Sequence, residues 1–148
     1  MGADHRRGFD DVAVGDVFEA GPREAPGAEI VGFAERYDPR PYHVSELAGR
    51  ESMFGGLVAS GIHTLAMWNG LRFEAEAGLD QIAGLGLDEV RYHQPVRPGD
   101  RLSLRAECIA REPSKSKPDR GVLNFRHELS NQDGELVMSL MALMLAAR

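Results

Sequence analysis

The sequence predicts an α+β domain in which an antiparallel β-sheet curls around one long buried helix. A stretch at residues 60–71 is apolar with helical character, and the second half of the chain changes to the period of two that half-buried strands show. One helix followed by a run of strands is typical of this fold class. The 148 residues fit one domain, which at this length buries roughly two-thirds of its unfolded surface.

The composition excludes several function classes. The chain has 17 basic and 23 acidic residues, a formal net charge of −6, and no long basic run, so we expect no nucleic-acid partner. Cys108 is the single cysteine, which excludes an intrachain disulfide framework and Cys-x-x-Cys motifs. The N-terminal residues lack an apolar segment, and the longest apolar run, residues 136–147, is too short to span a bilayer. We therefore expect a cytoplasmic protein without membrane contact.

Residues 1–8 have nothing to bury and are expected to form a flexible tail before a domain at 9–148. The first helix is predicted from residue 28 onward, because apolar side chains follow the spacing i, i+3, i+4, i+7 at Ile30, Phe33, Ala34 and Tyr37. Pro39 and Pro41 should end it, since each proline moves the preceding residue toward extended geometry. The segment 38–43 is therefore predicted to be stiff and non-helical.

The second helix is the predicted centre of the fold. Ser60 is a good N-cap, and the residues from Gly61 to Leu71 are apolar on nearly all sides. A helix of this kind is normally buried. We therefore expect the sheet to wrap around it.

Strands are predicted for the rest of the chain. Apolar and polar residues alternate over 101–110 and 123–129, and residues 85–96 and 136–145 supply the flanking strands. Clusters of turn-forming residues separate these segments. Such a sheet has edges, and pairing with a second copy would cover one of them, so we expect a homodimer or a higher even oligomer.

Two sets of residues are candidates for chemistry. Asp38 and His43 lie five positions apart on the proline-stiffened segment, where a carboxylate and an imidazole can act on one water as a general acid/base pair. Alternatively, the aspartate caps a loop and the histidine packs beneath it. Ser60 and Gly61 begin the buried helix, where free N–H groups favour developing negative charge. The alternative there is simple helix capping.

Other residues suggest no further site. His63 either faces the candidate site or satisfies a polar position in the core, whereas His93 and His127 are interpreted as structural. The histidines show no ligand spacing, so no metal site is expected. Ser60 lacks the flanking glycines of a hydrolase nucleophile elbow.

Several motifs together resemble a known family, the MaoC-like dehydratases, which include the (R)-specific enoyl-CoA hydratases. They are the stretches FAERYDPRPYH (residues 33–43), FGGLVASGIHT (54–64), DEVRY (88–92), PVRPGD (95–100) and NQDGE (131–135). The resemblance covers nearly the whole chain after the tail. It implies a hot-dog fold, in agreement with the periodicity, and dimers with thioester sites near the interface.

The resemblance also implies roles for particular residues. Asp38 and His43 fall on the acid/base pair of the family motif Asp-x-Asn-Pro-x-His, and Gly61 falls on the glycine whose N–H holds the thioester oxygen. Arg40 stands where the motif has Asn, and Asn69 where some members have a site Ser. We expect the substrate-binding residues to be Gly61, Ser60, His63, Asn69 and Arg40.

The expected activity is the addition of water to a 2-enoyl thioester of coenzyme A, or the reverse dehydration of an (R)-3-hydroxyacyl thioester. Asp38 is expected to be the base and His43 the acid. No cofactor is expected beyond the coenzyme A of the acyl-CoA substrate. The alternatives are a non-catalytic acyl-thioester-binding hot-dog subunit, or a hot-dog thioesterase that attacks the carbonyl carbon.

Overall fold

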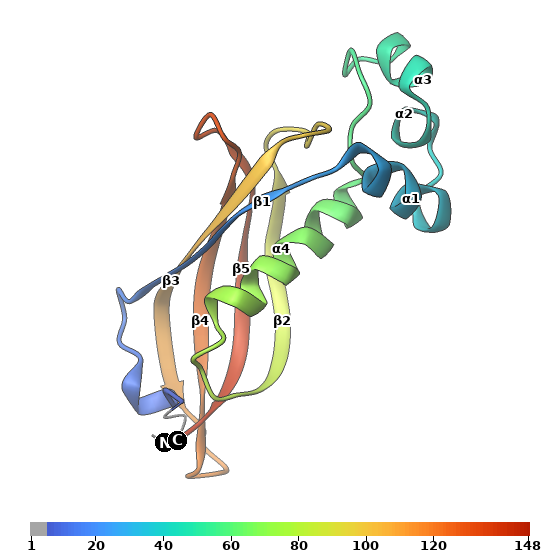
Figure 1. Ribbon diagram of the computed structural model, residues 1–148. Coiled ribbons are helices and arrows are strands. Elements are labelled where there is room, and N and C mark those ends of the chain that lie inside the picture. Colours follow the sequence, from blue (N-terminus) through green and yellow to red (C-terminus); the bar gives the residue numbers. More distant parts are fainter. Residues whose placement is uncertain (1–5) are drawn as a thin grey trace, which may run out of the picture.

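The computed structural model describes residues 6–148 as one curled antiparallel sheet with helices at one face and one end (Figure 1). In chain order the elements are a 3-10 helix η1 (Phe9–Asp11), β1 (Val17–Glu24), α1 (Gly27–Tyr37), α2 (Pro41–Val44), α3 (Glu46–Glu51), α4 (Gly61–Ala75), β2 (Gln81–Tyr92), β3 (Arg101–Pro113), β4 (Arg120–Ser130) and β5 (Leu136–Ala147). The strand order is β1-β3-β4-β5-β2, and every pairing is antiparallel. Helix α4 runs along one face of this sheet (Figure 1), which confirms the predicted α+β fold class.

The strands β3 and β4 form where apolar and polar residues alternate in the sequence. In β4, buried residues alternate with less buried ones along the whole strand, and β5 shows the same alternation from Met138 onward. Successive side chains of a strand point to opposite faces, so this alternation places one face of the sheet against the core. The strand predicted at 85–96 is displaced to Gln81–Tyr92, because the chain leaves the sheet before Pro95, which has no N–H to give to a ladder.

One strand, β1, was not predicted from the sequence, because Gly21 and Pro22 usually interrupt regular secondary structure. The structure places β1 at a sheet edge, paired only with β3, and its register shifts between Ala20 and Arg23. Proline is tolerated at an edge strand or a bulge, where no ladder hydrogen bond is needed from it. Pro22 lies within this register shift.

The helices α1, α2 and α3 gather beyond one end of the sheet (Figure 1). The prediction of a non-helical segment at 38–43 is wrong for its last residues, because Pro41 begins α2. Proline suits the first turn of a helix, where its missing N–H would be unpaired in any residue. Asp38 and Arg40, at the start of the segment, do have non-helical backbone angles.

The core lies between α4 and the sheet. Met67, Trp68 and Leu71 of α4 are buried against apolar side chains of the strands, and a second apolar cluster surrounds Phe9 and Phe125 near the chain termini. The opposite face of α4 is open, since Ile62 is 56% and Phe73 is 78% exposed. The prediction that α4 is buried on nearly all sides is therefore wrong for a single chain.

A buried polar contact joins α4 to β4. The Trp68 Nε1–H donates to His127 Nδ1 over 3.1 Å. Burial, with a smaller contribution from the neighbouring Arg72 charge, lowers the pKa of His127 to about 3. The ring is therefore neutral at ordinary pH, which agrees with the structural role predicted for His127.

The predicted tail, residues 1–8, lies partly outside the described residues. Of its last residues, Arg7 pairs with Leu79 in an isolated bridge, where its N–H donates to Gly78 O and its carbonyl accepts from Asp80 N, each over 2.8 Å. The flexibility of the tail stays a prediction.

Candidate functional site

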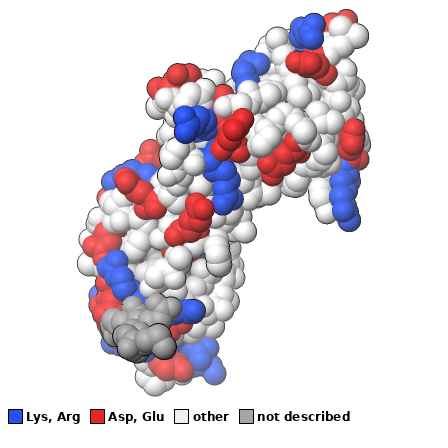
Figure 2. All heavy atoms as spheres, viewed as in Figure 1, with Lys and Arg blue, Asp and Glu red and all other residues white. Residues whose placement is uncertain are grey.

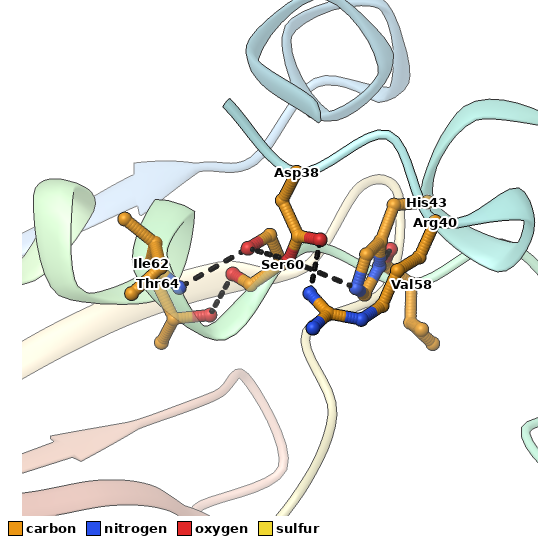
Figure 3. A network of polar contacts seen from close by, with 7 residues as sticks. All are labelled: Asp38, Arg40, His43, Val58, Ser60, Ile62 and Thr64. Atoms are coloured by element: carbon orange, nitrogen blue, oxygen red, sulfur yellow. Dashed lines mark hydrogen bonds and ion pairs between the residues drawn. The ribbon is translucent and has the colours of Figure 1, made fainter. Parts of the chain in front are cut away.

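The structure brings Asp38 and His43 together at the helical end of the molecule (Figure 3). Asp38 directly follows α1, where its N–H donates to Ala34 O over 2.9 Å, and His43 lies on α2. His43 Nε2 is 3.5 Å from Asp38 Oδ2, and both side chains are more than nine-tenths buried. The end of α1 therefore positions the carboxylate, and the short helix α2, which begins at Pro41, positions the imidazole next to it.

The ring of His43 has a defined hydrogen-bond partner on its other side. Its Nδ1 lies 2.7 Å from Val58 O. A carbonyl oxygen only accepts, so Nδ1 carries the hydrogen, and in the neutral ring Nε2 keeps its lone pair. Nε2 and Asp38 Oδ2 are then two acceptors pointing toward each other. A water molecule, with two O–H donors, can satisfy both of them at once.

Asp38 is held in its ionised form by its neighbours. Ser60 Oγ donates to Asp38 Oδ2 over 2.6 Å, and Arg40 Nη1 donates to Oδ1. The Ser60 hydrogen bond has the largest effect and, with the bond and charge of Arg40, it lowers the pKa of Asp38 despite the opposing effect of burial. The carboxylate is therefore an acceptor at neutral pH and not a proton source.

Ser60 connects this carboxylate to the start of α4. Its side-chain oxygen accepts from Ile62 N over 3.2 Å, which is the predicted N-cap contact, while its hydroxyl hydrogen is given to Asp38. The residue is fully buried, so the structure places it behind Asp38 without surface for a ligand. No spacing in the sequence indicates this contact, because the two residues are 22 positions apart.

Gly61 lines a cavity of about 320 Å³ at the start of α4. The lining residues come from the loop before α4, from its first turn and from the end of β2 and the loop that follows: Phe54, Ala59, Gly61, Thr64, Tyr92, His93, Gln94, Pro95 and Val96. Within residues 6–148, no protein group accepts the N–H of Gly61. Tyr92, which sequence reasoning did not single out, forms one wall of this cavity.

Two predicted site residues lie away from Asp38. His63 stacks on Phe33 of α1 with ring centroids 4.6 Å apart, and its Nε2 is 3.7 Å from Glu29 Oε1. Burial lowers the pKa of His63, although Glu29 opposes the effect. Asn69 is exposed on the open face of α4, eight residues and so about 12 Å beyond Gly61 along the helix axis.

Arg40, in contrast, is part of the site. Its guanidinium contacts Asp38 while its side chain remains 64% exposed.

The described part of the chain holds no cluster of three or more His, Cys, Asp or Glu side chains that would suit a metal ion. None of its helices is both long and apolar enough to cross a membrane.

Comparison with known proteins identifies a family that the chain matches. The family model for the MaoC like domain matches residues 11–125. Uncharacterized protein YdeM of Bacillus subtilis is 32% identical over 125 residues, which cover 84% of this chain and 87% of that protein. A crystal structure of a MaoC-like dehydratase from Rhodospirillum rubrum is 39% identical with a TM-score of 0.90, over 96% of this chain and 97% of that one.

A more distant structure shares the fold. The R-hydratase PhaJ1 from Pseudomonas aeruginosa, in its unliganded form, superposes with a TM-score of 0.78 at 22% identity, over 94% of this chain and 84% of that one. The long helix against a curled antiparallel sheet is thus the hot-dog fold that the sequence motifs imply. With the family model matched over most of its length, the chain belongs to the MaoC-like dehydratase family.

Proposed function

We propose that this protein catalyses the reversible addition of water to a 2-enoyl thioester of coenzyme A, giving an (R)-3-hydroxyacyl thioester. The observation that carries the proposal is the convergence of Asp38 Oδ2 and His43 Nε2, 3.5 Å apart, with the hydrogen of His43 committed to Val58 O. Membership of the MaoC-like dehydratase family supports the reaction class.

The contacts favour His43 as the base, in place of the expected assignment of that role to Asp38. A water between the two groups gives one hydrogen to His43 Nε2 as its oxygen bonds to C3 of the enoyl chain. Asp38, kept ionised by Ser60 and Arg40, accepts the other O–H and orients the attack. The π electrons of the C2–C3 bond move toward the thioester carbonyl, which becomes an enolate.

The catalytic cycle is completed without any proton source other than His43. The imidazolium of His43 returns its proton to C2, so the product gains one hydrogen and one hydroxyl, and the enzyme is restored. The neighbouring carboxylate of Asp38 stabilises the imidazolium while it exists. Since the same ring takes and gives the proton, both groups are expected to add to one face of the double bond.

Gly61 is proposed to hold the thioester oxygen. Its N–H lies at the start of α4, where the helix dipole favours negative charge. Gly61 lines the cavity and directly follows Ser60, whose hydroxyl donates to Asp38. The enolate oxygen carries more charge than the ground-state carbonyl, so this hydrogen bond strengthens as water adds.

We also propose that the protein acts as a homodimer. The open face of α4 exposes Ile62 and Phe73, and the edge strand β2 exposes Ile82, Leu85 and Leu87. Figure 2 shows mainly uncharged atoms on the side of the molecule where β2 lies. An isologous pairing of two copies would cover this surface.

The test follows the loss of enoyl absorbance from crotonyl-CoA, and from longer enoyl thioesters, with a free-thiol assay in parallel. Asp38→Asn and His43→Ala are each expected to lower kcat/KM by a factor of about 10² to 10⁴, the range of general acid–base catalysis. Asp119→Asn is the matched control, because Asp119 is an exposed carboxylate paired with Arg120 in the β3–β4 turn.

Three outcomes separate the functions. Absorbance loss without free thiol, abolished in the two site variants and kept in the control, supports the hydratase. Release of thiol contradicts it in favour of a thioesterase. Binding of the thioesters without any reaction contradicts it in favour of an acyl-thioester-binding subunit.

A further inference from the structure

Tyr92 is packed against the glycine at which the thioester oxygen is proposed to bind. A β-carbon at position 61 would lie 2.9 Å from Tyr92 Cζ and 3.2 Å from both Cε atoms. The hydroxyl-bearing end of the ring therefore covers the Gly61 α-carbon. Any side chain larger than hydrogen at position 61 would therefore displace this ring.

The fold fixes this placement from two directions. Tyr92 is the last residue of β2, where it pairs with Met138 of β5, and Gly61 is the first residue of α4. A helix directs its Cα–Cβ bonds toward its own N-terminus, so the ring lies at the end of α4 where the N–H groups are free. Both residues line the same cavity, and Gly61 directly follows Ser60, which donates to Asp38.

The phenolic hydroxyl is available as a donor. Within residues 6–148 the hydroxyl makes no hydrogen bond, although the ring is half-buried. Burial raises the pKa of Tyr92, so the hydroxyl keeps its hydrogen throughout the neutral pH range. A protonated phenol with no protein partner, on the wall of a cavity, can donate to a ligand.

We propose that the Tyr92 hydroxyl is a second hydrogen-bond donor to the thioester oxygen, beside the N–H of Gly61. This inference rests on the proposed hydratase function. One backbone N–H supplies a single hydrogen bond to the enolate oxygen, whereas an oxyanion has room for two. Tyr92 supplies the second at the same helix end, and it does so without taking part in proton transfer.

The variant that tests the inference is Tyr92→Phe, which keeps the ring on Gly61 and removes only the hydroxyl. The expected result is a fall of about 10- to 100-fold in kcat with a smaller change in KM, because the hydrogen bond is strongest to the charged oxygen. Tyr37→Phe is the matched control, since Tyr37 is exposed on α1 and contacts Phe33. It is expected to leave kcat unchanged.

A second measurement is independent of turnover. Butyryl-CoA cannot be hydrated, and the infrared stretch of its thioester carbonyl reports how strongly the bound oxygen is polarised. The stretch is expected at a lower frequency in wild type than in Tyr92→Phe. A kcat within twofold of wild type, or an unchanged stretch in Tyr92→Phe, would overturn the inference.

The two proposals fail in different ways. If wild type hydrates no enoyl thioester, the hydratase function is refuted, and a carbonyl stretch that still depends on Tyr92 keeps the donor role as a binding contact. If wild type is active but Tyr92→Phe is equally active, only the role of Tyr92 is refuted. A wild type that neither hydrates enoyl thioesters nor binds butyryl-CoA refutes both.

Discussion

At the scale of single residues, the site depends on the charge of one carboxylate. Asp38 serves the proposed mechanism only when it is ionised. The contribution of this carboxylate to the rate is therefore lost as the pH falls through the pKa of Asp38. Ser60 first, and Arg40 second, lower that pKa below its ordinary value. The acid limb of the pH profile reports proton uptake by the Asp38–His43 pair, because His43 must also be unprotonated to act as the base. Removing either neighbour raises the pKa of Asp38 and therefore moves proton uptake by this pair to higher pH.

The prediction concerns Arg40→Asn, which restores the residue of the family motif. We expect the acid limb of kcat/KM to move upward in pH, while activity at pH 8 and above stays near wild type because Asp38 is ionised there in both proteins. The measurement is a profile of kcat/KM from pH 4 to pH 9. Arg36→Asn is the control, since Arg36 lies over Tyr37 and makes no contact with Asp38.

Two results would contradict this account of Arg40. An acid limb that stays in place in Arg40→Asn would show that the guanidinium does not control proton uptake by the Asp38–His43 pair. A uniform loss of activity at all pH values would instead mean that Arg40 contacts the substrate or the reacting atoms.

The sequence predicts single residues only where they are near in the chain. The five-residue spacing of Asp38 and His43 was visible, and the family motif added their roles. The bond from Ser60 to Asp38, the stacking of His63 on Phe33 and the contact of Tyr92 with Gly61 all join distant segments. Such contacts depend on how elements pack, and no periodicity in one segment reports them.

At the scale of elements, the short helix α3 shapes the loop that borders the site. Gly49 is buried in α3, and a β-carbon there would lie 2.5 to 2.6 Å from the backbone of Gly56 and Leu57. This loop leads through Val58, the partner of His43, to Ser60. Close approach of α3 to the loop therefore supports the position of the imidazole.

A pair of glycine variants tests this contact. Gly49→Ala is expected to lower the free energy of unfolding by about 1 to 3 kcal/mol, because a backbone cannot move aside as a flexible side chain can. Gly32→Ala, in the middle of α1 with no atom within 4 Å of the new carbon, is expected to raise it by about 0.5 to 1 kcal/mol. Urea unfolding of both variants and wild type measures the two changes. Equal stability of Gly49→Ala and wild type would refute the close contact.

Elements were predicted well where the pattern was strong and poorly at prolines. The alternation of β3 and β4, and the Ser60 cap of α4, led directly to the observed elements. Pro22 and Pro41 misled the prediction in opposite ways. The first lies inside an edge strand and the second begins a helix, and the choice between these positions is made by neighbours that are distant in the sequence.

At the scale of the whole molecule, the single chain leaves apolar side chains of α4 and β2 exposed to solvent. Sequence patterning placed an all-apolar helix at the centre, yet one face of α4 is open in the single chain, with exposed positions at 62, 66, 69 and 73. Strand β2, with 12 residues, lies at one edge of the sheet. A long unpaired strand edge and an exposed apolar helix face are both surfaces that proteins normally cover.

The last prediction is that this surface joins two copies of the chain. Light scattering after size exclusion is expected to give wild type about twice the chain mass of 16.2 kDa. Phe73→Glu on α4 and Leu85→Lys on β2 each put a charge into the interface, and burying an unpaired charge is costly, so both variants are expected to elute as monomers. Val14→Glu is the control, because Val14 is also an exposed apolar residue but precedes β1 at the opposite sheet edge. A monomeric wild type, or dimers that persist in both interface variants, would show that the open face of α4 and β2 serves another partner or none.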